Sequence, residues 1–257
     1  MNTQNTHKTE AIILRSFDVR EYDRIYTIFS REHGKLCVVG IGTRKPTAKL
    51  ASGLEPLTKS EVFLVKGRKF DKVRGVIIHK QYQRMRKNLD LLCEGKKTAR
   101  IIEQLSEEGQ VSDEIYQLFC EYLKSLDELG GDSEKEKSRG EKLGEAKLLQ
   151  LALVWKLIKW SGHEPKLYHC AHCNSRLENS DRFLFSFPDG VLCDKCKSSA
   201  GAISVRVGKD TIKLLRIFLS HDAKTIRKIK CSLNALKQTI LASKTMLENL
   251  VGRRIDL

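Results

Sequence analysis

The stretch YHCAHCNSRLENSDRFLFSFPDGVLCDKC, residues 168–196, contains two Cys-x-x-Cys pairs separated by 19 residues. Each pair can place two thiolates on one metal ion, and two pairs complete the four-sulfur tetrahedron of a structural zinc site. The residues between the pairs predict a short hairpin, with RFLFSF as one strand, PDG as the turn and VLC as the return. The stretch therefore predicts a zinc ribbon.

The expected cofactor is one structural Zn²⁺, and its predicted ligands are Cys170, Cys173, Cys193 and Cys196. Four thiolates fill the four positions of tetrahedral zinc, whereas catalytic zinc keeps one position for water or substrate. His169 and His172 could replace a cysteine, but the four thiols already suffice. A redox pair and an iron–sulfur cluster are the alternatives. Two tight pairs in a hairpin, without a βαβ pattern, favour zinc.

The segment before the ribbon divides into strands and then helices. Residues 8–80 contain short β-branched runs such as EAIILRSFDV, DRIYTIFS and KLCVVGIG, separated by glycine and polar breaks. Four or five strands without a long helix predict a small barrel or sandwich. From residue 84 to 130 the apolar residues recur every three or four positions, which predicts helices.

The remaining segments predict a flexible linker and more helices. GGDSEKEKSRGEK, residues 130–142, has no apolar residue and is expected to be a flexible charged linker. LGEAKLLQLALVWKLIKW predicts an apolar helix that ends near Gly162, and two further helical patterns follow the ribbon. The expected domains are therefore a barrel over residues 1–80 and a helical domain over 81–257, with the zinc module at 166–199.

The charge of the chain is positive and concentrated at its two ends. The net formal charge is +15. Residues 1–80 carry 16 Lys and Arg against 8 Asp and Glu, residues 197–257 carry 13 against 4, and residues 81–196 carry 18 against 20. Strongly basic segments are typical of nucleic-acid-binding proteins. A solvated basic surface and an anionic membrane surface are the weaker alternatives.

Basic residues of the N-terminal segment lie in the expected loops between strands, where they could follow a phosphate backbone. The candidate DNA-binding residues are Arg31, Lys35, Arg44, Lys45, Lys49, Lys66, Arg68, Lys69 and Lys72. Aromatic residues are interleaved with them, at Phe17, Tyr26, Phe29, Phe63 and Phe70, and most of these are expected in the core because they sit on the expected strands. Phe70, within GRKFDK, is the candidate for stacking on a base.

Several stretches together resemble the RecO family of bacterial recombination mediators: EAIILRSFDVREYDRIYTIFSREHGKLCVVGIGTRK, LEPLTKSEVFLVKGRKFDKV, LVWKLIKWSGHEPKLYHCAHC, FSFPDGVLCDKC and LENLVGRRI. The resemblance covers nearly the whole chain. It implies an α+β multidomain protein, with an N-terminal OB-fold barrel and a C-terminal helical domain that carries the inserted four-cysteine zinc module. REYD stands where many members have Gly-Glu-x-Asp.

The resemblance also implies a function. The family binds single- and double-stranded DNA and anneals complementary strands. With RecR it helps to load RecA onto DNA coated by single-strand-binding protein, whose C-terminal tail it binds. The expected protein is therefore a cytoplasmic, nucleoid-associated DNA repair protein and not an enzyme. No signal peptide or membrane span is expected.

Two other classes stay open from the residues alone. A nucleic-acid-processing enzyme with accessory barrel and ribbon would need a catalytic motif such as Lys-x-Asp-Gly, which the sequence lacks. A zinc-ribbon transcription or translation factor is the third reading. Strand annealing would favour the mediator over both.

Overall fold

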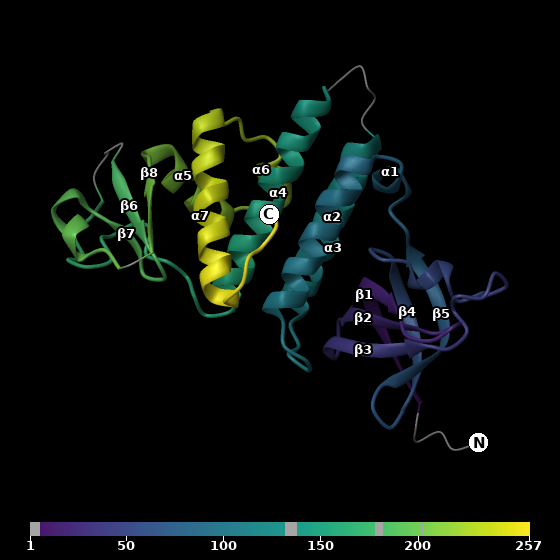
Figure 1. The fold of residues 1–257 in the computed structure, drawn as a ribbon. Helices are drawn as coiled ribbons and strands as arrows, with labels where there is room; N and C mark the ends of the chain where they lie inside the picture. The colour runs from purple at the N-terminus through teal and green to yellow at the C-terminus, as the bar shows by residue number, and fades with distance from the viewer. Residues whose placement is uncertain (1–5, 132–137, 178–181, 202) are drawn as a thin grey trace. The chain divides into compact units, whose positions relative to one another are not determined.

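The computed structural model describes residues 6–131, 138–177, 182–201 and 203–257, which group into two compact units (Figure 1). The N-terminal unit is Met1–Ser138 and the C-terminal unit is Arg139–Leu257. Among the described residues, none of the helices combines the length and hydrophobicity that crossing a membrane requires.

The N-terminal unit contains strands followed by helices. Its elements are β1 (Thr6–Asp18), β2 (Arg24–Ser30), β3 (Gly34–Gly40), η2 (Ser52–Leu54), β4 (Lys59–Val65), β5 (Asp71–Lys80), α1 (Gln83–Arg86), α2 (Leu89–Leu105) and α3 (Asp113–Gly131). The five strands form a closed barrel in the order β1-β2-β3-β5-β4. All neighbours are antiparallel except β3 and β5, which pair in parallel. This confirms the predicted OB-fold barrel.

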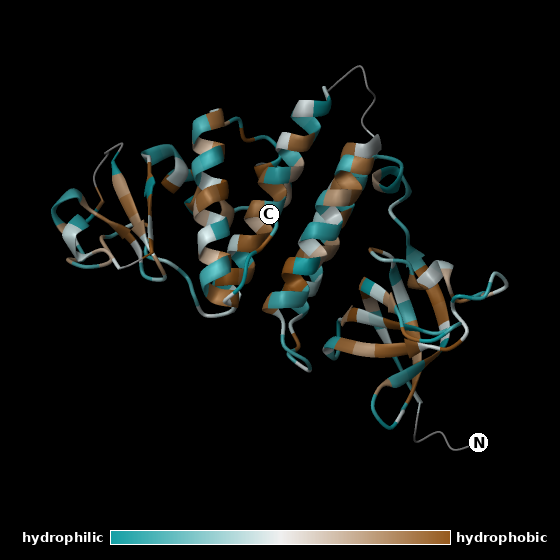
Figure 2. Cartoon of the chain, in the orientation of Figure 1, coloured by the Kyte–Doolittle hydropathy of each residue, from teal (hydrophilic) through white to brown (hydrophobic). Residues whose placement is uncertain are grey.

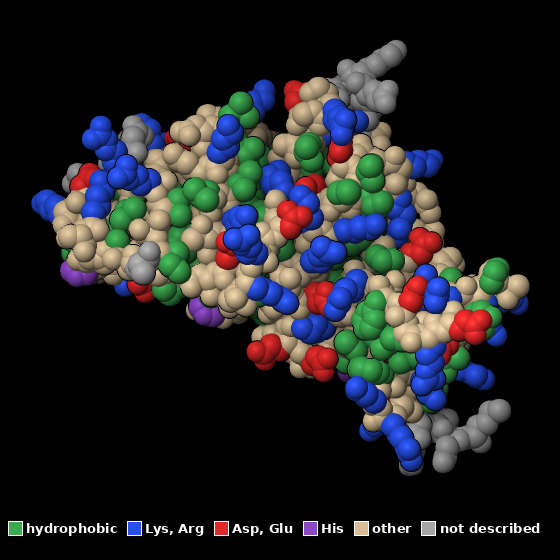
Figure 3. All heavy atoms as spheres, in the orientation of Figure 1, with side chains coloured by type: hydrophobic (Ala, Val, Ile, Leu, Met, Phe, Trp, Pro, Cys, Tyr) green, Lys and Arg blue, Asp and Glu red, His purple; other side chains and the backbone are tan. Residues whose placement is uncertain are grey.

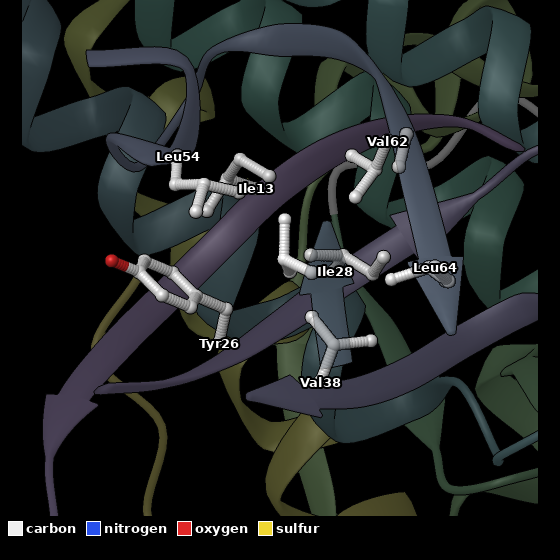
Figure 4. Packing of buried hydrophobic residues seen from close by; sticks show 9 residues of the cluster. Ile13, Tyr26, Ile28, Val38, Leu54, Val62 and Leu64 are labelled. Atoms are coloured by element: carbon white, nitrogen blue, oxygen red, sulfur yellow. The ribbon is translucent and has the colours of Figure 1, made fainter. Parts of the chain in front are cut away.

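The barrel core follows from the two-residue period of its strands. Tyr26 and Ile28 of β2 point inward beside Val38 of β3 (Figure 4). The 3₁₀ turn η2 adds Leu54, which is fully buried in this core. Gly53 permits the close approach of η2 to β5, because a Cβ at this position would lie 2.5 Å from the Val76 side chain. Figure 2 shows the resulting hydrophobic segments in the barrel strands.

The turn between β2 and β3 is fixed against the loop between α2 and α3. Gly34 adopts a left-handed conformation with φ of 66°, and an isolated bridge joins it to Glu108. A Cβ at Gly34 would lie 2.2 Å from the Gln110 carbonyl oxygen. Nearby, Phe29 packs on Tyr116 of α3 with ring centroids 6.2 Å apart. The helices therefore cover this end of the barrel.

The predicted domain boundary at residue 80 coincides with the end of β5, but the barrel and helices α1–α3 belong to one compact unit.

Both ends of the predicted linker at 130–142 are helical in the structure. Gly130 and Gly131 are the last residues of α3, and a Cβ on Gly130 would lie 2.6 Å from the Arg84 carbonyl oxygen, so glycine here serves close packing. Residues 139–142 begin α4, and residues 132–137 lie outside the described part.

The C-terminal unit places a three-stranded sheet against helices. Its elements are α4 (Arg139–Trp160), β6 (Phe183–Ser186), β7 (Gly190–Leu192), η3 (Asp194–Ser199), β8 (Ser204–Val207), α5 (Lys209–Ser220), α6 (Ala223–Ile226) and α7 (Leu233–Val251). Trp155 of α4 is fully buried, donates its Nε1–H to Ser243 Oγ of α7 at 2.8 Å, and meets Phe185 of β6 edge to face. One side chain thus joins helices and sheet.

We predict that Gly34→Ala destabilises the N-terminal unit more than Gly42→Ala. Both glycines have φ near 67° (66° and 68°), but a Cβ at Gly42 meets nothing closer than 3.8 Å. Both variants should lose about 1–2 kcal/mol of unfolding free energy for the left-handed conformation. Gly34→Ala should lose about 1–3 kcal/mol more for the displaced loop. Urea unfolding measures both losses, and equal values would contradict the contact.

Candidate nucleic-acid interface and metal centre

The first cysteine pair is held in a tight turn. The Cys170 N–H donates to the Ser175 carbonyl at 2.8 Å, and the Asn174 N–H donates back to the Cys170 carbonyl at 3.0 Å. Asn174 takes the left-handed conformation, with φ of 57°, that this turn requires. Both thiols of the pair therefore face the same side.

The second pair follows the predicted hairpin, which β6 and β7 form with Ser186 opposite Gly190. The segment around Cys170 lies along β7. Lys166 donates its N–H to the Asp189 carbonyl and accepts from the Val191 N–H, and the Ala171 N–H donates to the Val191 carbonyl. A Cβ on Gly190 would lie 2.4 Å from the Lys166 carbonyl oxygen, so glycine permits this approach. The two pairs are thereby brought face to face.

The four predicted ligands, Cys170, Cys173, Cys193 and Cys196, form one group whose Sγ atoms all lie within 4.8 Å of one another. The Cys173 and Cys193 sulfurs are 3.8 Å apart. Four sulfurs at about 2.3 Å from a tetrahedral zinc would be about 3.8 Å apart, so the cluster fits such an ion. The group can hold a metal ion. Within the described residues it includes no histidine, and His169 and His172 are exposed.

The thiols of the cluster differ in acidity. Hydrogen bonds from Ser175 lower the pKa of Cys173 to about 6, whereas burial raises the pKa of Cys196 to about 12. A metal binds thiolates, so binding must displace the proton of Cys196. Metal affinity is therefore expected to fall as the pH is lowered.

The cluster is tied to the helices of its unit. Leu192 and Leu184 pack against Cys170 and Cys196. Arg216 of α5 donates through Nε and Nη2 to the Leu167 carbonyl at 3.1 and 2.5 Å, just before the first pair. The arrangement is that of a structural module attached to a helical scaffold.

We predict that Cys193→Ser releases the metal and loosens the ribbon while the barrel stays folded. A structural metal site of this kind contributes on the order of 10 kcal/mol to folding at neutral pH. Metal content and limited proteolysis check this, with Cys231→Ser as the control, because Cys231 is half-buried outside the cluster. Full metal content and unchanged melting, together with weaker DNA binding, would contradict it.

Two of the nine candidate DNA-binding residues contact the helices of their own unit. Arg31 Nε lies 2.6 Å from Asp113 Oδ1 of α3, and this hydrogen bond lowers the pKa of the Asp113 carboxyl. Lys35 Nζ donates to the Glu103 carbonyl of α2 at 2.9 Å. These contacts give both residues a role in holding helices on the barrel.

The other seven candidates fall into two groups, one in the loop after β3 and one in and just after the β4–β5 loop. Arg44, Lys45 and Lys49 lie in the loop after β3, where Arg44 N–H donates to the carbonyl of Tyr22 in the β1–β2 loop. Lys66, Arg68 and Lys69 lie in the β4–β5 loop and Lys72 begins β5, and Lys66 shares a cavity with His33 of the β2–β3 turn. Phe70 is half-buried, with Lys69 Nζ 5.4 Å from its ring centroid.

A row of apolar side chains crosses the outer surface between these groups. Phe17 pairs with Ile25, Ile25 with Val39, and Val39 with Lys72. Tyr26 and Val38 point into the core, so Ile25 and Val39, which are next to them along their strands, point outward. Phe17 pairs with Ile25 and lies on the same outer face. We call Phe17, Ile25 and Val39 the apolar strip. It connects the loop of Lys45 to the start of β5.

Tyr26 and Phe29 are buried, as expected for most of the interleaved aromatic residues, but Phe17 is an exception and is 41% exposed. A β-bulge between Ile13 and Arg15 moves the following residues of β1 to the opposite face. Beside the strip, Tyr22 is 45% and Ile41 57% exposed. Lys45 Nζ lies 5.2 Å from the Tyr22 ring centroid. Figure 3 shows hydrophobic side chains bordered by Lys and Arg on the barrel face in view.

These features define a multidomain α+β protein with an OB-fold barrel, helices and a four-cysteine ribbon. Family models described as the N-terminal and C-terminal parts of recombination protein O match residues 1–82 and 98–256. The chain therefore belongs to the RecO family.

Curated proteins with similar sequences are also members of this family by name. The chain is 30% identical over 214 residues to DNA repair protein RecO of Pelotomaculum thermopropionicum, which covers 83% of this chain and 77% of that protein. It is 26% identical to the protein of the same name from Desulfitobacterium hafniense strain Y51, over 97% of this chain and 86% of that protein. The counterpart from Alkaliphilus metalliredigens is 28% identical, over 91% and 92%.

Proposed function

We propose that the chain is a DNA-binding recombination mediator in DNA repair that works without a catalytic step. It binds single- and double-stranded DNA and anneals complementary strands. With RecR it assists the loading of RecA onto DNA coated by single-strand-binding protein. The observation that carries the DNA-binding part is the apolar strip, which contains the exposed ring of Phe17, has the exposed ring of Tyr22 beside it, and has cations on both sides.

The strip suits a single strand for physical reasons. Bases stack on exposed aromatic rings whatever their sequence, and each stacked base contributes about 1–3 kcal/mol. Lys45 on one side and Lys72 on the other can neutralise the phosphates of the same strand, whereas Arg44 beside Lys45 pairs with Asp18 at 3.2 Å. The β4–β5 loop continues this charge through Lys66, Arg68 and Lys69.

Annealing then needs no reacting group. Two strands bound to one basic protein have a raised local concentration, and the cations screen the repulsion between their phosphates. Complementary bases pair once the strands meet. The proposal includes a structural Zn²⁺ in the four-cysteine cluster and action in the cytoplasm at the nucleoid. Its protein partners, RecR, RecA and the tail of single-strand-binding protein, follow from the family.

We predict that the chain accelerates annealing of complementary oligonucleotides and that Phe17→Ala with Tyr22→Ala slows it. Loss of each stacked base should weaken single-strand binding by about fivefold to a hundredfold. Fluorescence-detected annealing, with and without RecR, and anisotropy titrations measure both effects. Leu89→Ala is the control, since Leu89 is 73% exposed at the start of α2 in the same unit. Annealing no faster than the spontaneous rate would refute the function.

We predict that Lys45→Glu with Arg68→Glu weakens binding to all DNA sequences alike. Each lost phosphate contact should reduce the slope of log affinity against log salt by about 0.7 for a single strand. Titrations at several salt concentrations measure the slope. Lys124→Glu makes the same charge change on an exposed position of α3 and should have a smaller effect. An unchanged slope in the double variant would show that these loops do not contact DNA.

A further inference from the structure

A cavity of about 710 Å³ lies in the C-terminal unit, beside the cysteine cluster. It is lined by β6, β8, η3 and α7, and includes the cations Arg182, Lys197 and Arg206. None of the described residues that line it is acidic. Cavities of about 300–1,000 Å³ hold small ligands, so this one is large enough for a nucleotide.

The sheet directs its cationic residues to one face. Arg206 of β8 stands directly opposite Leu184 of β6, and Arg182 lies two residues before Leu184, so all three share a face. The other face carries Phe185, which packs on Trp155. Lys197 reaches the cavity from η3, one residue after Cys196, and also pairs with Asp194. The fold thus gathers positive charge on the exposed side of the sheet.

Gln238 of α7 adds an oriented amide to the cavity. Its Oε1 accepts hydrogen bonds from the Gly208 N–H and the Thr211 hydroxyl, both at 2.9 Å. These two donors fix the amide, so the group that Gln238 can offer a ligand is its NH₂. Gly208 immediately precedes α5, whose N-terminal end carries a partial positive charge. The polar lining therefore consists of donors suited to an anion.

The charge of the whole unit favours a phosphate ligand that belongs to a nucleic acid. Residues 139–257 contain 22 Lys and Arg against 11 Asp and Glu, a net charge of +11 out of the +15 of the chain. Figure 3 shows Lys and Arg over the ribbon and sheet of this unit. Guanidinium groups bind phosphate in a bidentate manner, and apolar residues such as Leu184 can face a sugar or base.

We propose that this cavity is a second nucleic-acid site, which binds a phosphorylated nucleotide of a DNA strand through Arg206, Lys197, Arg182 and Gln238. The inference rests on the proposed function, because it supplies the second strand that annealing requires. It goes beyond that function in placing a strand on the C-terminal unit, apart from the barrel. The ribbon then has a binding role besides its structural one.

The test titrates the full-length, metal-loaded chain with a short oligodeoxythymidylate in a calorimeter. The wild-type chain should show two binding events. Arg206→Glu should weaken one of them about tenfold or more, as expected for a lost charged hydrogen bond, and leave the other unchanged. Phe17→Ala with Tyr22→Ala should weaken the other event. Arg206→Gln serves as a milder second variant, and metal content and melting are measured for each.

Lys213→Glu is the matched control, because Lys213 is exposed on α5 in the same unit and does not line the cavity. Both binding events should persist in this variant. Two unchanged events in folded Arg206→Glu and Arg206→Gln would overturn the inference and leave the proposed function standing. Binding of an acidic peptide, but not of the oligonucleotide, at Arg206 would overturn the choice of ligand. No binding of the oligonucleotide by the wild-type chain would refute inference and function together.

Discussion

The parallel pairing of β3 with β5 is the constraint on which the N-terminal unit depends. Only two residue pairs, Val38 with Asp71 and Val39 with Lys72, make this ladder, yet they close the barrel and leave neither strand as a free edge. The same pairing places Lys72, and with it the β4–β5 loop, at the end of the apolar strip. A short hydrogen-bonded contact therefore determines both the closure of the core and the layout of the candidate interface.

Helices α2 and α3 then divide the outer surface of the barrel. At the β2–β3 turn they bury Phe29, engage Arg31 and Lys35, and approach Gly34 closely. At the other end of β2 the surface stays open around Phe17 and Tyr22. Basic residues that look equivalent in the sequence thus have different roles: Arg31 and Lys35 contact Asp113 and the Glu103 carbonyl and hold helices in place, whereas Lys45 lies beside the exposed ring of Tyr22.

The sequence was sufficient for features that depend on local spacing. The four cysteines, the ribbon hairpin, the barrel strands and the helical period were all predicted, because each follows from neighbouring residues. The place of Phe17 was not, since one bulge at Leu14 reverses the faces of β1 and the sequence has no marker for it. The pairing of β8 with β6, and hence the cavity, was also missed, because it joins segments separated by a turn and the second cysteine pair.

A metal ion held by the four cysteines would matter for binding even though its coordination is closed. Four thiolates would leave it no coordination position for a ligand, so it would not bind DNA itself. Its effect reaches the surface through packing: Leu184 and Cys196 belong to one cluster, and the residues next to them in β6 and η3 line the cavity. Holding the four sulfurs together also holds η3, and with it Lys197, at the cavity that Arg206 lines. A metal that only stabilises the fold can in this way determine the spacing of the charges that a phosphate would meet.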